Sequence, residues 1–246
     1  MKPTDEMLAQ KNGADKFLTQ IRKYTDEVII AGGFARDWVL RTKYDYDTTI
    51  NDVDLYVKFT PSLKRWLEDM KSKDICEEQT NGYKGLNNLD SVYKFYTQFP
   101  KEGTNELFAP TFDVEFQVIV LNTELDIETH VKDHFDLSIC MVTYDGNDFK
   151  ELPDFTKTLE TKIITFNDKL GFQETEYGFK KHVAKITCRF AGKGFKYEGY
   201  NPKFGGERYN CKLINRTRLS DKMMEENKWL YKTKNYYYYD ENAGVY

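Results

Sequence analysis

A short apolar run, a pair of glycines and a strand that opens on two aspartates constrain this sequence most. Residues Val28–Ala31 are β-branched except for the alanine, as expected of a strand covered on both faces. Gly32 and Gly33 lack a Cβ atom, so a ligand can approach the backbone closely at this turn. A helix predicted at Phe34–Leu40 would point its free N–H groups and its positive dipole end toward the turn, which favours a phosphate.

Two carboxylates are predicted to share one face of the next strand. Asp52 and Asp54 alternate with Val53 and Leu55, and side chains two residues apart in a strand point to the same side. Carboxylate oxygens are ligands that Mg²⁺ prefers. The glycine turn and the two aspartates therefore predict a site for a magnesium-bound nucleoside triphosphate (NTP).

These features resemble the DNA polymerase β-like nucleotidyltransferase superfamily. Within it, the segment GGFARDWVL resembles the Gly-Gly-x-x-Arg-Asp-x-x-Leu head of tRNA CCA-adding enzymes and bacterial poly(A) polymerases. The resemblance covers about residues 26–145. It implies an α/β fold, in which a short, mixed and strongly twisted sheet has helices packed on one side and is followed by a basic, aromatic C-terminal segment.

The resemblance also implies a third acid on a neighbouring strand, and Thr111–Asn122 is the best candidate for that strand. Asp113, Glu115 and Gln117 alternate with apolar residues there, so they share a face. Glu115 fits the superfamily's pattern best, while Asp113 on the same face stays open. The exposed polar face of an edge strand is the alternative interpretation.

The implied chemistry is nucleotidyl transfer with two Mg²⁺ ions. Asp52 and Asp54 would bridge the ions, and Glu115 would complete the nucleophile-side site and accept the hydroxyl proton. Asp45 and Asp47 lie nearer to the spacing of the CCA-adding pattern and stay open as an alternative pair. The later pair is preferred because LYVKF continues it as a strand.

The same resemblance assigns the nucleotide to the glycine turn. Gly32 and Gly33 would hold the β- and γ-phosphates through backbone N–H groups. Arg36 is implied to contact phosphate or sugar, and Asp37 to fix the turn. The base of the NTP is left open, and ATP is the working assumption.

The C-terminal part differs from the rest in charge. Residues 175–246 contain 15 Lys/Arg and 8 Asp/Glu, whereas residues 1–174 contain 21 and 32. Cations interleaved with aromatic rings, such as the run Tyr236–Tyr239, suit stacking on unpaired bases. RNA is therefore the predicted partner, and an ordinary uneven surface is the alternative.

Three cations of this part are predicted to bind the nucleotide. Lys185 and Arg189 share one face of a helix expected over residues 174–191, and Lys193 follows in the segment RFAGKGF. That segment resembles a signature of small stand-alone nucleotidyltransferase-like proteins of phages and large DNA viruses. A solvated basic face is the alternative.

Several weaker patterns complete the prediction. A helix is expected at Asp5–Lys23, broken or kinked near Gly13, and a buried strand at Leu137–Tyr144. His130 and His134 lie four residues apart, but two ligands do not complete a zinc site, so they are interpreted as surface helix residues.

Composition limits the cellular setting. No uncharged run approaches the length that spans a bilayer, so no integral membrane protein is expected. The four cysteines are far apart and form no C-x-x-C pair, which favours a reducing cytoplasm, that of the host if the protein is viral.

The combined prediction is a nucleotidyltransferase core at residues 1–170, and a basic, aromatic region at residues 171–246 made of a helix and an irregular tail. It would transfer NMP from an NTP to an acceptor hydroxyl, most favourably on RNA. A nucleotide- or RNA-binding module without turnover is the alternative, as is a toxin-like enzyme that nucleotidylates a host protein or small molecule. The oligomeric state stays open.

Overall fold

The computed structural model describes residues 1–79, 89–100, 111–135, 137–165, 190, 193–197, 211–213, 238–240 and 244–245. For residues 97–100, 111–113, 197 and 211 onward, only the backbone is described. The chain divides into two compact units, the first formed by residues 1–135 and 140–155, and the second by residues 136–139 and 156–246.

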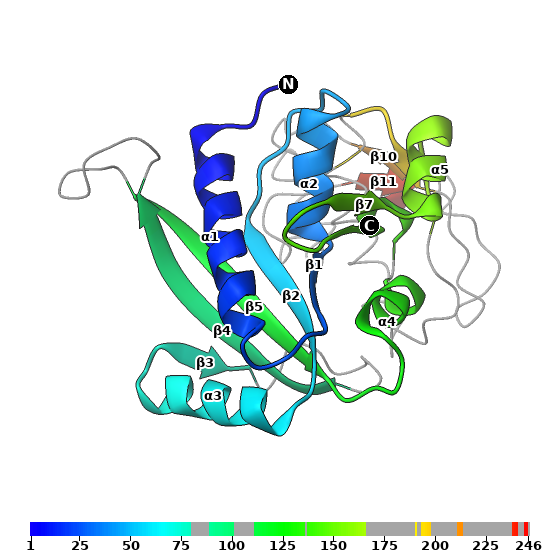
Figure 1. The fold of residues 1–246 in the computed structure, drawn as a ribbon. Helices are drawn as coiled ribbons and strands as arrows, with labels where there is room; N and C mark the ends of the chain where they lie inside the picture. The colour runs from blue at the N-terminus through cyan, green and yellow to red at the C-terminus, as the bar shows by residue number, and fades with distance from the viewer. Residues whose placement is uncertain are drawn as a thin grey trace. The chain divides into compact units, whose positions relative to one another are not determined.

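The first unit is built on a seven-stranded mixed sheet with the order β3-β4-β5-β2-β1-β6-β7 (Figure 1). Only the central pair, β2 and β5, is parallel; every other neighbouring pair is antiparallel. The strands are β1 (Val28–Ala31), β2 (Asp52–Lys58), β3 (Cys76–Glu78), β4 (Leu89–Pro100), β5 (Thr111–Leu121), β6 (Val142–Tyr144) and β7 (Phe149–Glu151).

Helices connect and cover these strands. They are α1 (Asp5–Ile21), α2 (Gly33–Thr42), α3 (Pro61–Ser72) and α4 (Ile127–His134). A 3₁₀ turn (Ser138–Cys140) and α5 (Pro153–Thr161) lie where the chain passes between the two units. Side-chain caps fix two of the starts: Thr4 accepts a hydrogen bond from the Met7 amide, and Thr60, just before Pro61, accepts one from the Leu63 amide.

Fully buried and half-buried residues alternate along β2, and this alternation distinguishes the two faces of the sheet. Val53, Leu55 and Val57 are fully buried, whereas the residues between them, including the two aspartates, are half-buried. The fully buried residues lie on the face that α1 and α2 cover (Figure 1). A period of two therefore places the acids on the opposite, more open face, as the sequence predicts.

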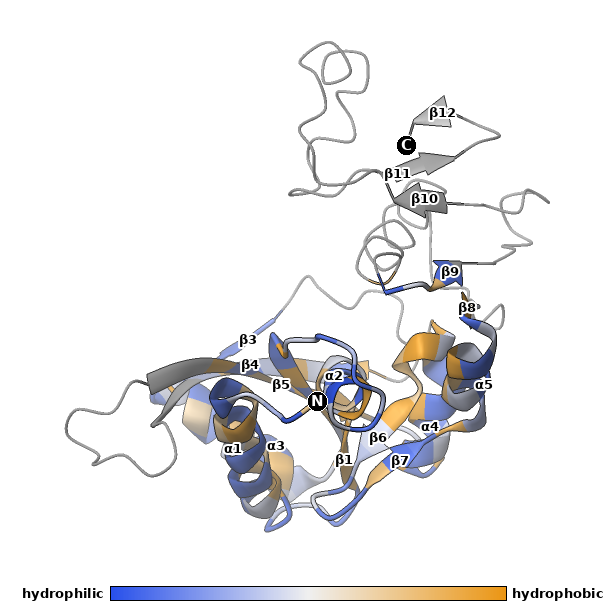
Figure 2. Cartoon of the chain, turned by 90° about the horizontal axis from the view of Figure 1, so that it is seen from above, coloured by the Kyte–Doolittle hydropathy of each residue, from blue (hydrophilic) through white to orange (hydrophobic). Residues whose placement is uncertain are grey.

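An aromatic cluster joins α1 and α3 to the covered face. The rings of Phe17 and Phe116 stack with centroids 4.8 Å apart, and those of Trp66 and Phe95 stack at 5.8 Å. Tyr24, just past α1, stacks on Trp66 at 5.1 Å. Both helices consequently lie on one side of β4 and β5 (Figure 2), because their rings bury apolar area against the same strands.

Helix α4 packs against the other face, at the end of the sheet away from the aspartates. Ile127 and Val131 form a buried cluster with Ala31, Ile119 and Leu121. The covered and open faces are thus unequal: α4 closes one end of the acid-bearing face and leaves the end that carries the acids half-buried.

Two local expectations turn out differently. Helix α1 runs unbroken through Gly13, which is buried, so packing outweighs the cost of about 1 kcal/mol for a helical glycine. The continuous strand expected at Leu137–Tyr144 is wrong, because a 3₁₀ turn at Ser138–Cys140 interrupts it. Leu137 forms an isolated bridge, and Val142–Tyr144 pairs with β1 and β7. Apolar runs do not by themselves distinguish a strand from a buried turn.

The second unit contributes small sheets. Strands β8 (Ile163–Ile164) and β9 (Lys196–Tyr197) pair in parallel, and β10 (Cys211–Leu213), β11 (Tyr238–Asp240) and β12 (Gly244–Val245) form an antiparallel sheet. The helix expected over residues 174–191 lies outside the described residues except at Phe190.

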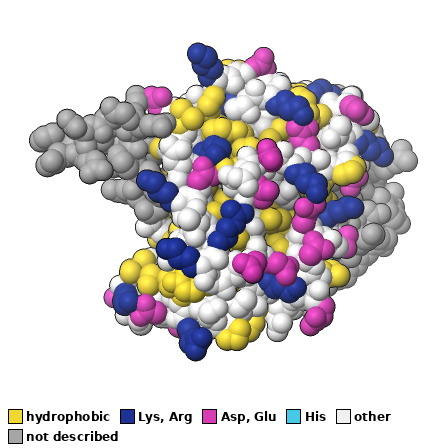
Figure 3. All heavy atoms as spheres, viewed as in Figure 1, with side chains coloured by type: hydrophobic (Ala, Val, Ile, Leu, Met, Phe, Trp, Pro, Cys, Tyr) yellow, Lys and Arg dark blue, Asp and Glu magenta, His cyan; other side chains and the backbone are white. Residues whose placement is uncertain are grey.

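The expected mixed α/β fold is confirmed by the seven-stranded sheet and its helices. The helices are not all on one side, since α4 packs on the face opposite α1 and α3. Lys/Arg and Asp/Glu side chains intermix on the face that carries α1 and α2, without a patch of one sign (Figure 3). In the part of the chain that the structure describes, no helix combines the length and the apolar character needed to cross a membrane.

Strand β2 carries both the core and the acids, so its buried side is expected to dominate stability. Leu55→Ala should lower the free energy of unfolding by about 2–5 kcal/mol, because Leu55 is fully buried. Leu125→Ala is the matched control: Leu125 is 42% exposed, and its loss should change stability by less than about 0.5 kcal/mol. Urea unfolding measures both, and equal losses would contradict the assignment of β2 to the core.

Candidate active site

The register between β2 and β5 brings the predicted acids together. Asp52 pairs with Glu115 and Asp54 with Gln117 across this parallel ladder. Paired residues of parallel strands point to the same face, and neighbouring strands lie about 4.8 Å apart. The three acids that the sequence singles out therefore occupy one small area at the start of β2.

The glycine turn lies directly against these acids. Gly32 has φ +81°, in the region that favours glycine, and Gly33 begins α2. A Cβ atom at Gly33 would lie 3.4 Å from Asp52 Oδ1, and one at Gly32 would lie 3.9 Å from Asp54 Oδ2. Backbone and carboxylates thus face each other with no side chain of the turn between them.

Of the two amides that the sequence assigns to the phosphates, that of Gly32 already has an acceptor in the protein. The Gly32 amide donates to the Val142 carbonyl at 3.3 Å, which ties the turn to β6. The first hydrogen bond of α2 runs from the Arg36 amide to the Gly32 carbonyl, at 2.9 Å. The helix rule leaves the amides before Arg36, from Gly33 onward, without intrahelical acceptors. Gly32 leaves room for a ligand because it has no Cβ atom, and the first residues of α2 supply the free amides.

Asp54 is the electrostatic centre of the site. Its Oδ1 is buried and has no hydrogen-bond partner among the described residues. Burial, together with the negative charges of Asp52 and Glu115, raises the pKa of Asp54 from its usual 3.8 to about 8, although the positive charges of Arg36 and Lys94 offset part of the rise. A buried carboxylate with an unsatisfied oxygen beside two like charges is stabilised by a cation.

Glu115 is held by two neighbours. Lys94, on β4, forms an ion pair with Glu115 Oε1 at 2.7 Å, and Gln117 Nε2 donates to the same oxygen at 2.8 Å. The hydrogen bond to Glu115 raises the pKa of Lys94. Sequence reasoning missed Lys94, although the segment SVYKFYT at Ser91–Thr97 has the composition of a strand, in which Lys94 and Tyr96 share a face.

Arg36 and Asp37 form a buried support behind the turn. The Arg36 guanidinium is 2% exposed, donates to both carboxylate oxygens of Asp37 at 3.0 and 2.7 Å, and donates to Cys140 Sγ at 3.2 Å. The Asp37 carbonyl accepts from Thr48 Oγ1 at 2.6 Å, which anchors the loop before β2. Arg36 acts on Asp54 through its charge; direct contact with a nucleotide stays a prediction.

The alternative acids lie elsewhere. Asp45 pairs with the N-terminal amine, and Asp47, whose side chain is 84% exposed, pairs with Arg41 at 2.7 Å. Both belong to the surface loop between α2 and β2. The backbone of Asp113 pairs with Gln98, beyond the point where β2 begins opposite Glu115.

Two of the predicted C-terminal cations are not described, and the third belongs to the second unit. Lys185 and Arg189 lie outside the described residues. Lys193 lies in a turn of the second unit and is half-buried. Their binding of a nucleotide stays a prediction.

The acid cluster fits a divalent cation in charge but not yet in geometry. Within the described ranges, no three His, Cys, Asp or Glu side chains stand close enough to hold a metal ion together. The unpartnered Asp54 Oδ1 and the mutual repulsion of the carboxylates are the features that suit a cation. Asp52 and Asp54 could hold one with hard-oxygen ligands, whereas Glu115 is occupied by Lys94.

The interpretation of His130 and His134 as surface residues is wrong for His130. His130 is 1% exposed, its ring stacks on that of His134 at 4.0 Å, and burial lowers its pKa to about 4. The i, i+4 spacing predicted a shared helix face but not which way that face points.

A family model matches residues 8–162, more than half of the chain. The chain belongs to the Gabija anti-defense 2 family. The matched segment includes the glycine turn, the three acids and Lys94. A comparison with curated proteins finds no significant match.

Two solved structures resemble this family member at low identity. A tRNA-processing enzyme in an apo form is 12% identical, with a TM-score of 0.47, and is matched over 94% of this chain and 49% of its own. A CCA-adding enzyme in complex with CTP is 15% identical, with a TM-score of 0.43, over 76% and 40%. The chain therefore spans about half or less of the length of either enzyme.

The raised pKa of Asp54 makes metal-free stability pH-dependent. Between about pH 4 and 8 the folded protein retains a proton that the unfolded chain has lost, so the free energy of unfolding falls as pH rises through this window. Above pH 8 both states are ionised and the loss levels off.

Asp54→Asn removes this titration. In EDTA at pH 8, the variant should melt roughly 2–8 °C above wild type, and the two should converge near pH 4. Thermal unfolding across the pH range measures the difference. Asp47→Asn, which changes an exposed acid, should follow the wild-type curve, and parallel curves for wild type and Asp54→Asn would contradict the burial argument.

Proposed function

We propose that this protein is a divalent-metal-dependent nucleotidyltransferase that moves NMP from an NTP to an acceptor hydroxyl. One observation carries the proposal: Asp52, Asp54 and Glu115 share a face in register, with an unpartnered buried oxygen, directly opposite a glycine turn at a helix start. Phosphate binding and cation binding would meet there, as phosphoryl transfer from a triphosphate requires.

The turn would bind the triphosphate. The amides at the start of α2 and the positive end of its dipole face the acids across a gap that lacks a Cβ atom. Buried Arg36 adds a fixed positive charge behind them. These groups would orient the β- and γ-phosphates and favour departure of pyrophosphate.

In the proposed reaction the acids would hold two Mg²⁺ ions. When bound, these ions would neutralise charge on the α-phosphoryl group. Asp52 and Asp54 would be shared ligands, because both carboxylates face the turn. Glu115 would complete the nucleophile side and accept the proton of the attacking hydroxyl. Its two donors, Lys94 and Gln117, fix its orientation.

RNA is the acceptor we propose first. The excess of cations in residues 175–246, with aromatic residues among them, supports an anionic acceptor that carries bases. A host protein as acceptor is the second candidate, supported by the family's description as anti-defense against Gabija. The same description supports a phage origin and action in the host cytoplasm. Binding of a nucleotide without turnover is the third.

A transfer assay separates these candidates. The protein is incubated with each labelled NTP, Mg²⁺ and either total RNA or host lysate protein. Label in RNA supports the first candidate, label in protein supports the second, and retained NTP binding without transfer supports the third. Transfer that persists unchanged in EDTA would rule out the metal-dependent mechanism.

Loss of the central acids should abolish transfer. Asp52→Asn and Asp54→Asn are each expected to lower the rate roughly a hundredfold or more, because both remove charge that would hold the cation. The matched control Asp47→Asn removes an exposed acid of the neighbouring loop and should leave the rate within about twofold. Loss of activity in that control would instead favour the earlier acid pair.

The two glycines should respond differently to alanine. Gly33→Ala should fold normally, since its Cβ would meet Asp52 at 3.4 Å, but it should weaken NTP binding roughly tenfold or more by placing a methyl group where phosphate would approach. Gly32→Ala should lower stability, since the φ of +81° is strained for any residue with a Cβ atom. Nucleotide titration and thermal unfolding distinguish them; normal NTP affinity in folded Gly33→Ala would contradict the phosphate site.

A further inference from the structure

The ion pair between Lys94 and Glu115 places a cation of the protein itself inside the candidate metal site. Lys94 Nζ lies 2.7 Å from Glu115 Oε1, and the negative charge of Asp52 also acts on this ammonium group. Its charge also acts on Asp54, so the ammonium interacts with all three proposed metal ligands. In the metal-free protein it supplies part of the positive charge that a divalent ion would supply.

An ammonium group and a divalent ion cannot share Glu115 without a large repulsion. With Lys94 at hydrogen-bond distance and a metal at coordination distance from the same carboxylate, the two cations would lie only about 4–5 Å apart.

Lys94 is able to leave. Its side chain is 23% exposed and that of Glu115 27%, so the ammonium can reach water without crossing the core. A lysine has a flexible stem and a compact charge, and so gives up one acceptor for another readily. Both described donors to Glu115 meet at Oε1, so the interaction with Lys94 can end while Gln117 still orients the carboxylate.

We propose that Lys94 is a positioning residue that holds Glu115 in the metal-free protein and that a divalent cation must displace it to bind the three acids. This rests on the proposed function, because it assumes that Asp52, Asp54 and Glu115 are metal ligands. The pair keeps the acid cluster partly neutralised while it is empty. It also lowers the affinity of the site for a free metal ion. Occupancy of the site therefore depends on a cation that brings additional binding energy, such as one already bound to an NTP.

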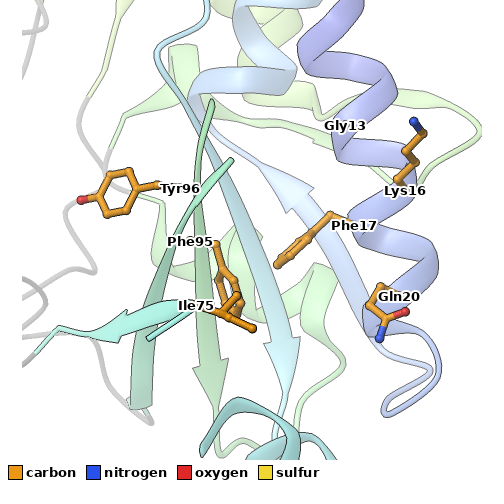
Figure 4. Close-up of a pocket in the computed structure, with 7 residues that line it drawn as sticks. All are labelled: Gly13, Lys16, Phe17, Gln20, Ile75, Phe95 and Tyr96. Atoms are coloured by element: carbon orange, nitrogen blue, oxygen red, sulfur yellow. The ribbon is translucent and has the colours of Figure 1, made fainter. Parts of the chain in front are cut away.

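The pocket on the other side of β4 does not belong to this arrangement. It has a volume of about 260 Å³ and holds no acidic side chain (Figure 4). Phe17, Phe95 and Ile75 converge in it, while the Tyr96 ring points away, toward the side of the strand that carries Lys94. Its lining residues are Gly13, Lys16, Phe17, Gln20, Ile75, Phe95 and Tyr96.

Metal affinity tests the proposal without any turnover. Mn²⁺ is titrated into the full chain and free Mn²⁺ is followed by electron paramagnetic resonance. Lys94→Gln should bind Mn²⁺ roughly three- to tenfold more tightly than wild type, because the competing half-buried ion pair is gone. Lys94→Met serves the same purpose without an amide that could pair with Glu115, and Lys94→Arg, which keeps the competing charge, should differ from wild type by less than about twofold.

A double-mutant cycle shows whether Lys94 acts through Glu115. If Lys94 acts through Glu115, Lys94→Gln should change Mn²⁺ affinity by less than about twofold in a protein that already carries Glu115→Gln. The same tightening in both backgrounds would mean that Lys94 acts only as a nearby charge and would overturn the proposal. Lys64→Gln, which removes another half-buried lysine paired with Asp90 at 3.2 Å, is the control for charge alone and should leave Mn²⁺ affinity unchanged.

Thermal unfolding gives a second readout. In EDTA, Lys94→Gln should melt below wild type, and saturating Mn²⁺ should remove most of the difference, because the pair stabilises only the metal-free state. A difference that persists in Mn²⁺ would indicate an ordinary structural ion pair and would overturn the proposal.

Failure of this inference is distinguishable from failure of the proposed function. If Asp52→Asn and Asp54→Asn abolish Mn²⁺ binding and Lys94→Gln leaves it unchanged or weaker, the metal site stands and the displacement is wrong. If wild type and all variants fail to bind Mn²⁺, both proposals are wrong.

Discussion

The parallel pairing of β2 with β5 is the constraint on which the candidate site depends. These strands provide all three acids, and a shift of one residue in either strand would turn its acids toward the aromatic core under α1. The pairing is held from the covered side, where Val53, Leu55 and Val57 alternate with the acid face and are fully buried. The apolar half of β2 thus fixes the position of its polar half.

That arrangement concentrates three carboxylates on a half-buried face of the sheet. Among the described residues Asp54 Oδ1 has no hydrogen-bond partner, and the pKa of Asp54 is raised to about 8. Burying such a carboxyl group lowers the stability of the fold, so its presence suits a site that binds a ligand. The chain places a buried guanidinium, Arg36, on one side of the cluster and a half-exposed ammonium, Lys94, on the other. The difference in burial separates their roles: Arg36 is locked by Asp37 and Cys140, whereas Lys94 can exchange its acceptor.

The local features of the site could be predicted from sequence because they follow from chain periodicity. The Gly-Gly turn, the α2 helix and the shared face of Asp52 and Asp54 need only neighbouring residues. Partners across the sheet could not be predicted the same way. The ion pair of Lys94 with Glu115 depends on β4 pairing with β5 in one register, and the burial of His130 depends on what covers α4. A sequence pattern gives the face on which a side chain lies but not what meets it there.

The family match and the charge distribution divide the chain in nearly the same place. The match ends at residue 162 and contains the turn, the acids and Lys94. The excess of Lys and Arg begins after it, in residues 175–246. The site of the proposed chemistry is therefore contained in one compact unit, since β1, β2, β4, β5 and α2 all belong to it. A site assembled within a single sheet can retain its geometry whatever acceptor is presented to it, so the acids define the reaction and the remainder of the chain is the place to look for the acceptor's determinants.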